Sequence, residues 1–115
     1  ALWLGPMTCA LVGHSAGGAV ALEAAVALRE AGRPAAAVVL LDAVPFEGTL
    51  AVAERFDLAA TRLVSVRAEP SVWNKQGGIA EALARVPEGP PGRLVDLRVR
   101  GARHGDPMEP SLALR

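Results

Sequence analysis

The sequence predicts an α/β fold with a parallel β-sheet, and three observations lead to this prediction. Four apolar segments typical of strands alternate along the 115 residues with helical or irregular segments. One of them, residues 36–41 (AAVVLL), is apolar throughout, as strands buried on both faces of a parallel sheet are. The β-α-β order then implies right-handed crossovers between the strands.

The first elements follow from local composition. Residues 7–12 (MTCALV) predict the first strand, and residues 16–31 predict a helix that Gly32 and Pro34 bring to an end. Because apolar side chains surround nearly all of this helix, we expect it to be buried over most of its surface. We expect the single cysteine, Cys9, to be a buried thiol.

The rest of the chain continues the alternation. Residues 62–67 predict the third strand, and residues 77–86 predict a helix with one apolar face. Residues 93–100 alternate apolar and polar side chains, which indicates a half-exposed strand near the sheet edge. Residues 44–57 form a long connection to which the sequence assigns no element.

The composition indicates one small domain over residues 1–115. Hydrophobic residues make up 51% of the chain, which is ample for a packed core. The formal net charge is zero, so we expect neither nucleic acid nor an anionic membrane as a partner. No apolar stretch approaches the roughly 20 residues of a membrane span, and no cluster of ligands has metal spacing. We therefore expect no membrane span, no metal and no cofactor.

The stretch VGHSAGG places Ser15 where the first strand runs into the helix. A nucleophilic serine at such a turn needs a strained backbone, and we expect Gly13 and Gly17 to remove side chains that would block it. We expect Gly18 to let the helix pack close to the sheet. The N-terminus of the helix directs its N–H groups at a developing oxyanion, with the backbone N–H of Ala16 as one donor.

Residues of complementary chemistry follow the predicted strands. Ser15, Asp42, Glu69 and His104 each come just after a strand, and the carboxyl ends of parallel strands share one edge of the sheet. The order serine, acid, histidine is that of a hydrolase triad. His104 is the candidate base, because the other histidine, His14, adjoins the serine and is expected to point elsewhere on the turn.

Two carboxylates compete for the role of triad acid. Glu69 follows the third strand, where the acid of such a triad usually lies. Asp42 ends an apolar strand on a shorter side chain, so we expect it to be more buried and more firmly held. We favour Asp42 and keep Glu69 as the alternative.

A strand, a glycine-rich loop and a helix are also typical of a dinucleotide site, in which Asp42 would hold a ribose. That site requires the pattern Gly-x-Gly-x-x-Gly, and Ser15 occupies the position of its central glycine. The pattern therefore favours a serine hydrolase.

Three segments resemble the α/β-hydrolase superfamily, and within it the chlorophyllase-like and cutinase- or lipase-like serine esterases. These segments are GHSAGG, LLDAVPFEG and RHGDPMEP, and AEPSVWN is similar to a segment of bacterial members. The resemblance implies a parallel-sheet hydrolase fold and a triad of Ser15, Asp42 and His104. It also implies that the protein cleaves a small-molecule apolar ester through an acyl-enzyme.

The resemblance covers only the second half of such a hydrolase, so we expect a partial α/β-hydrolase domain without the loop that supplies the second oxyanion donor. Such a chain is expected to be marginally stable, to associate through its unpaired strand edge and to have little activity alone. Two alternatives stay open: a thioesterase or acyltransferase using the same triad, and an inactive truncated module.

Overall fold

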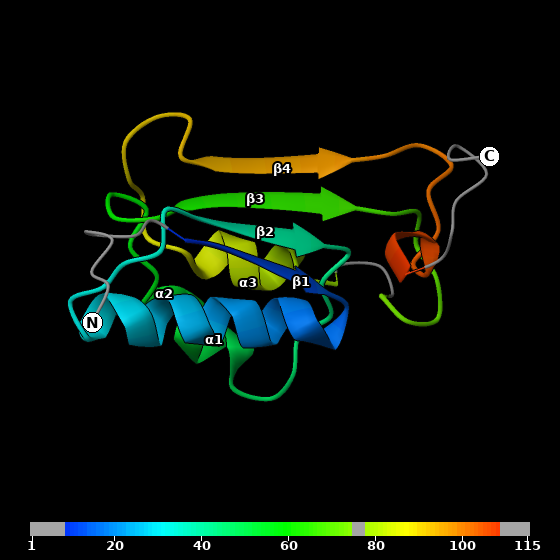
Figure 1. Cartoon of the computed structure of the whole chain (residues 1–115). Helices are drawn as coiled ribbons and strands as arrows, with labels where there is room; N and C mark the ends of the chain where they lie inside the picture. The colour runs from blue at the N-terminus through cyan, green and yellow to red at the C-terminus, as the bar shows by residue number, and fades with distance from the viewer. Residues whose placement is uncertain (1–8, 75–77, 109–115) are drawn as a thin grey trace, which may run out of the picture.

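The computed structural model describes residues 9–74 and 78–108 of the chain. These residues form a four-stranded sheet in the order β1-β2-β3-β4, and each neighbouring pair of strands is parallel. The strands and helices alternate along the chain (Figure 1): β1 (Ala10–His14), α1 (Ala16–Glu30), β2 (Ala37–Leu41), α2 (Thr49–Glu54), β3 (Arg62–Arg67), α3 (Ala80–Arg85) and β4 (Leu94–Arg98), followed by the 3-10 helix η1 (Asp106–Met108). The predicted α/β fold with a parallel sheet is confirmed.

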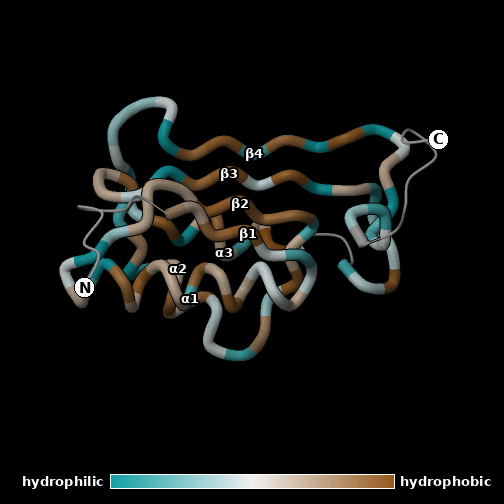
Figure 2. Tube along the Cα trace, viewed as in Figure 1, coloured by the Kyte–Doolittle hydropathy of each residue, from teal (hydrophilic) through white to brown (hydrophobic). Residues whose placement is uncertain are grey.

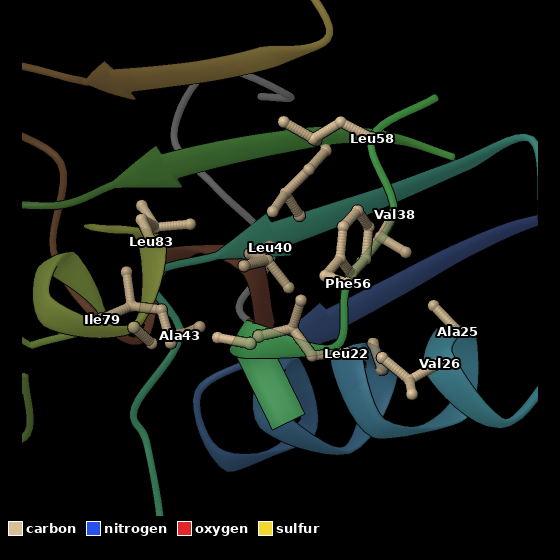
Figure 3. Close-up of a cluster of buried hydrophobic side chains, with 14 residues drawn as sticks. Leu22, Ala25, Val26, Val38, Leu40, Ala43, Phe56, Leu58, Ile79 and Leu83 are labelled. Atoms are coloured by element: carbon tan, nitrogen blue, oxygen red, sulfur yellow. The ribbon is translucent and has the colours of Figure 1, made fainter. Parts of the chain in front are cut away.

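The three α-helices lie on one side of the sheet (Figure 1). Successive strands are neighbours in space, so each right-handed crossover returns over the same face. The core fills the space between this face and the helices (Figure 3). Its fully buried large side chains come from α1, the strands and the start of α3: Leu22, Val38, Leu40, Leu63 and Ile79.

The opposite face of the sheet is apolar and largely uncovered by the described residues. Val12 in β1 is 63% exposed, and Leu97 in β4 is 51% exposed. Figure 2 shows hydrophobic residues along the strands and mainly hydrophilic ones in several connections. Alternate side chains of each strand point to opposite faces, so one apolar set packs against the helices and the other does not.

Two burial predictions are wrong for this reason. The helix α1 packs on the sheet by one side only, and Val20 on its other side is 54% exposed. Cys9, just before β1, is exposed rather than buried. An apolar composition thus overstated how much of the surface the described elements cover.

The main differences from the predicted element boundaries lie at β1, α2 and α3, and β4 is shorter than predicted, Leu94–Arg98. The strand β1 extends through Gly13 to His14, beyond the predicted end, while residues 7 and 8 lie outside the described part. The connection over residues 44–57 contains the helix α2, which begins after Gly48 in a left-handed conformation with φ of 93°. The helix predicted over residues 77–86 is shorter, Ala80–Arg85, and residue 77 lies outside the described residues.

Candidate active site

Ser15 occupies a strained turn between β1 and α1. Its φ is 58° and its ψ is −127°, a combination that residues other than glycine rarely adopt. Three backbone hydrogen bonds hold the turn: the Ser15 N–H donates to the Leu41 carbonyl (3.1 Å), and the Ser15 carbonyl accepts from Gly18 (3.0 Å) and Val44 (2.9 Å). The turn is therefore tied both to its own helix and to the end of β2.

Two of the three glycines around Ser15 are required by close packing. A Cβ on Gly13 would lie 2.1 Å from the carbonyl oxygen of Gly17, and a Cβ on Gly18 would lie 2.4 Å from the Cβ of Ala43. Gly18 thus allows α1 to approach the segment after β2. The prediction for Gly17 is wrong, because nothing lies within 4 Å of a Cβ placed there.

His104 contacts both Ser15 and Asp42. Its Nε2 lies 2.9 Å from the Ser15 Oγ, and its Nδ1 lies 2.6 Å from the Asp42 Oδ2. Ser15 follows β1, Asp42 follows β2, and His104 lies in the loop between β4 and η1. The strands end near η1 at one edge of the sheet (Figure 1), which is how residues distant in sequence meet there.

The Asp42 carboxylate is buried, with 4% of the residue exposed, and accepts three hydrogen bonds. Its Oδ1 accepts from the Ala68 N–H (2.9 Å), and its Oδ2 accepts from the Asn74 Nδ2 (2.7 Å) as well as facing His104. Burial acts to raise the pKa of Asp42, but the hydrogen bonds from His104, Asn74 and Ala68 outweigh it and hold this pKa below its ordinary value. The carboxylate is therefore kept ionised.

Glu69, the alternative acid, lies in a different environment. It is exposed, and its Oε1 accepts a hydrogen bond from the Gly101 N–H (3.1 Å). The Glu69 N–H donates to the Ala102 carbonyl (2.9 Å), so this residue joins the loops that follow β3 and β4. Among the described residues, the structure brings Asp42 rather than Glu69 to the imidazole of His104.

Three further residues lie close to these groups. The His14 Nε2 makes a hydrogen bond with the backbone carbonyl of His104, and the two rings lie 4.9 Å apart. The ring of Trp73 stacks near His104 at 6.2 Å, with an interplanar angle of 17°. Asn74 had no assigned role, although the spacing Ser-x-x-Asn from Ser71 is typical of a turn.

A hollow of about 410 Å³ borders His104. The loops after β3 and β4 line it, with Pro70, Trp73 and Ala102 among its apolar residues. It is large enough to receive part of a small-molecule substrate next to the imidazole.

Within residues 9–74 and 78–108, no three His, Cys, Asp or Glu side chains are grouped so that they could hold a metal ion. None of the described helices has the length and hydropathy needed to cross a bilayer.

The fold and the polar residues at the strand ends are of the α/β-hydrolase type. A family model described as Thioesterase domain matches residues 5–69, more than half of the chain. The chain therefore belongs to the thioesterase domain family, an α/β-hydrolase-like family of ester and thioester hydrolases. Comparisons with curated proteins and with solved structures found no match.

Proposed function

We propose that the protein hydrolyses a thioester through an acyl-enzyme on Ser15, with His104 as general base and acid and Asp42 as the orienting carboxylate. The observation that carries this proposal is the continuous chain of contacts from the Ser15 Oγ through both nitrogens of His104 to the Asp42 Oδ2, at 2.9 and 2.6 Å. These distances are within hydrogen-bond reach for a nucleophile and its base.

Acylation follows from this arrangement. The His104 Nε2 takes the hydroxyl proton as the Ser15 Oγ attacks the carbonyl carbon, which gives a tetrahedral oxyanion. The intermediate collapses, the carbon–sulfur bond breaks, and the leaving thiolate takes the proton from Nε2. Asp42 accepts the Nδ1–H throughout, which fixes the tautomer and stabilises the transient imidazolium.

Deacylation reverses the roles of the same groups. The His104 Nε2 takes a proton from water, and the resulting hydroxide attacks the acyl carbonyl carbon. The ester bond to the Ser15 Oγ breaks, the oxygen regains its proton from Nε2, and the carboxylic acid leaves. No oxidant, metal or cofactor is needed to balance either half of this cycle.

In this proposal the N-terminus of α1 stabilises the oxyanion. The first N–H groups of a helix have no acceptor within it, and Ala16 is the first residue of this 15-residue helix. We therefore assign the Ala16 N–H as one oxyanion donor, supported by the helix dipole.

The thioester is preferred to the oxygen ester because of the family to which the chain belongs. The resemblance of GHSAGG, LLDAVPFEG and RHGDPMEP to chlorophyllase-like and cutinase- or lipase-like esterases supports an apolar carboxylic ester as the second candidate. The two substrates share the acyl-enzyme and differ only in the leaving group, so the triad does not discriminate between them.

The test compares two substrates that carry the same octanoyl group, one on a thiol and one on the matching alcohol. We expect a higher kcat/KM for the thioester, and loss of both activities in Ser15→Ala. A higher value for the oxygen ester would move the assignment to a carboxylesterase. Octanoyl transfer to an added amine or alcohol in preference to water would make the protein an acyltransferase.

A further inference from the structure

Asn74 is a buried polar residue in the connection between β3 and α3, and the mechanism above gives it no role. Only 7% of it is exposed. Its side-chain Nδ2 donates to the Asp42 Oδ2 at 2.7 Å, the same oxygen that faces the Nδ1 of His104 at 2.6 Å. One carboxylate oxygen is thus held between an amide and an imidazole.

The orientation of the Asn74 amide is fixed from its other side. Its Oδ1 accepts from the Ser71 N–H (2.6 Å) and from the Ser71 Oγ (3.2 Å). Its Nδ2 also donates to the Glu69 carbonyl (3.1 Å). Because Ser71 supplies donors and Asp42 supplies an acceptor, the NH₂ group faces the carboxylate and the oxygen faces away.

This arrangement leaves Asp42 little freedom to rotate. The Ala68 N–H holds Oδ1 at 2.9 Å, and Asn74 holds Oδ2, so the carboxylate plane is set before the imidazole binds to it. Asn74 also contributes to the lowered pKa of Asp42, which favours the ionised form.

We propose that Asn74 is a positioning residue that aims the Asp42 carboxylate at His104 and keeps it charged. This proposal rests on the proposed hydrolysis, because the orientation of the His104 imidazole affects turnover only if His104 is the general base. Asn74 touches neither Ser15 nor the reacting atoms, so its effect passes through Asp42. A displacement of about 1 Å in such a group costs on the order of 10²-fold in rate.

Two substitutions of Asn74 separate positioning from simple packing. Asn74→Ala removes the donor and leaves a small cavity. Asn74→Asp keeps the shape but sets a second carboxylate against Asp42, where like charges at this distance disfavour ionisation of both. Ser71→Ala is the matched control: it removes the hydroxyl contacts to the Asn74 Oδ1 and to the Trp73 N–H, and it leaves the Ser71 N–H and the contact of Asn74 with Asp42 in place.

The first readout is steady-state kinetics of the full chain on the octanoyl thioester. We expect kcat to fall about 10²-fold in Asn74→Ala and further in Asn74→Asp, with KM changed less than threefold, while Ser71→Ala stays within threefold of the parent in both constants. Equal kcat in the parent and all three variants, or an effect of the Asn74 variants on KM alone, would overturn the proposal.

The second readout does not depend on activity. We expect the proton between the His104 Nδ1 and the Asp42 Oδ2 to give a far-downfield proton NMR signal, which Asp42→Asn should abolish and Ser71→Ala should keep. We expect the signal to shift or broaden by exchange in Asn74→Ala and in Asn74→Asp. An unchanged signal in folded Asn74→Ala would show that Asn74 only packs, whatever the outcome for Ser15.

The pH dependence of stability distinguishes the two variants further. The pKa of Asp42 is lowered in the folded protein, so its contribution to stability is complete above the ordinary carboxyl range and is lost as the pH falls through the folded pKa. The repulsion in Asn74→Asp raises the pKa of the carboxyl pair, so its stability deficit should be greatest near pH 7 and should shrink as the pH falls toward about 4, because the pair takes up a proton above the ordinary carboxyl pKa. A deficit independent of pH would contradict a charge contact with Asp42.

Discussion

The substitution Asp42→Asn tests which carboxylate serves His104. The Asp42 Oδ2 accepts from the Asn74 Nδ2 and faces the Nδ1 of His104, and its Oδ1 accepts from the Ala68 N–H. An asparagine at position 42 has one oxygen and one NH₂ group in place of Oδ1 and Oδ2. In either orientation the NH₂ group faces a hydrogen-bond donor: the Ala68 N–H at the Oδ1 position, or the Asn74 NH₂ at the Oδ2 position.

Whether Asp42→Asn loses activity or stability depends on the orientation of the new amide. With NH₂ toward His104, the imidazole must accept at Nδ1 and carry its proton on Nε2, so it cannot take the proton of Ser15. With NH₂ toward Ala68, a buried N–H loses its acceptor at about 1–3 kcal/mol. Under the proposed mechanism the wrong tautomer lowers kcat by about 10⁴-fold, or about 5 kcal/mol of transition-state stabilisation.

The assay measures kcat on the octanoyl thioester for Asp42→Asn and for the control Glu69→Gln. A glutamine at position 69 keeps an oxygen that can accept the Gly101 N–H, so we expect its kcat to stay within a few-fold of the parent. A loss of less than tenfold in Asp42→Asn would refute the reasoning. A larger loss in Glu69→Gln would transfer the role of the acid to Glu69.

Three further predictions follow from the same structure. Gly18→Ala should lower the free energy of unfolding by about 1–3 kcal/mol in urea titrations, because its Cβ would lie 2.4 Å from that of Ala43. The control Gly17→Ala should be neutral or stabilising by up to about 1 kcal/mol, and an equal loss in both would reject this packing argument. The stability of the parent should fall as the pH drops below about 4, since Asp42 has a lowered pKa, and thermal melts from pH 3 to 7 should show a smaller fall for Asp42→Asn. His104→Ala should reduce kcat about as much as loss of the nucleophile does, because triad members act as a unit; more than a tenth of parental activity would count against that role.

The grouping of polar residues at one edge of the sheet could be predicted from the sequence, because it depends on the order of strands and helices along the chain and not on where each strand ends. Apolar runs give the parallel strands, and residues just beyond their carboxyl ends must share an edge of the sheet. That rule grouped Ser15, Asp42, Glu69 and His104, and the expected burial of Asp42 favoured it over Glu69. The structure places Ser15 and Asp42 at the two nitrogens of His104. Their chemical roles stay predictions.

Features that depend on loop conformation could not be predicted in the same way. The contact of Asn74 with Asp42 requires the turn that begins at Ser71, and the contact of His14 with the His104 carbonyl requires the β4–η1 loop to fold back over β1. The helix α2 has only six residues and no capping side chain, so its local signal is weak. The exposed fraction of α1 could not be predicted for another reason. This helix is apolar on nearly all sides, yet among the described residues it packs against β1, β2 and α2 and leaves Val20 exposed.

The most direct test of the central claim is covalent labelling of the nucleophile. The full chain and its Ser15→Ala variant are treated with a fluorophosphonate, and the adduct is located by peptide mass spectrometry. The account predicts a single adduct on Ser15, blocked by prior incubation with the octanoyl thioester and absent from the variant. An adduct on another residue, or undiminished labelling and turnover in Ser15→Ala, would contradict the claim that Ser15 is the nucleophile.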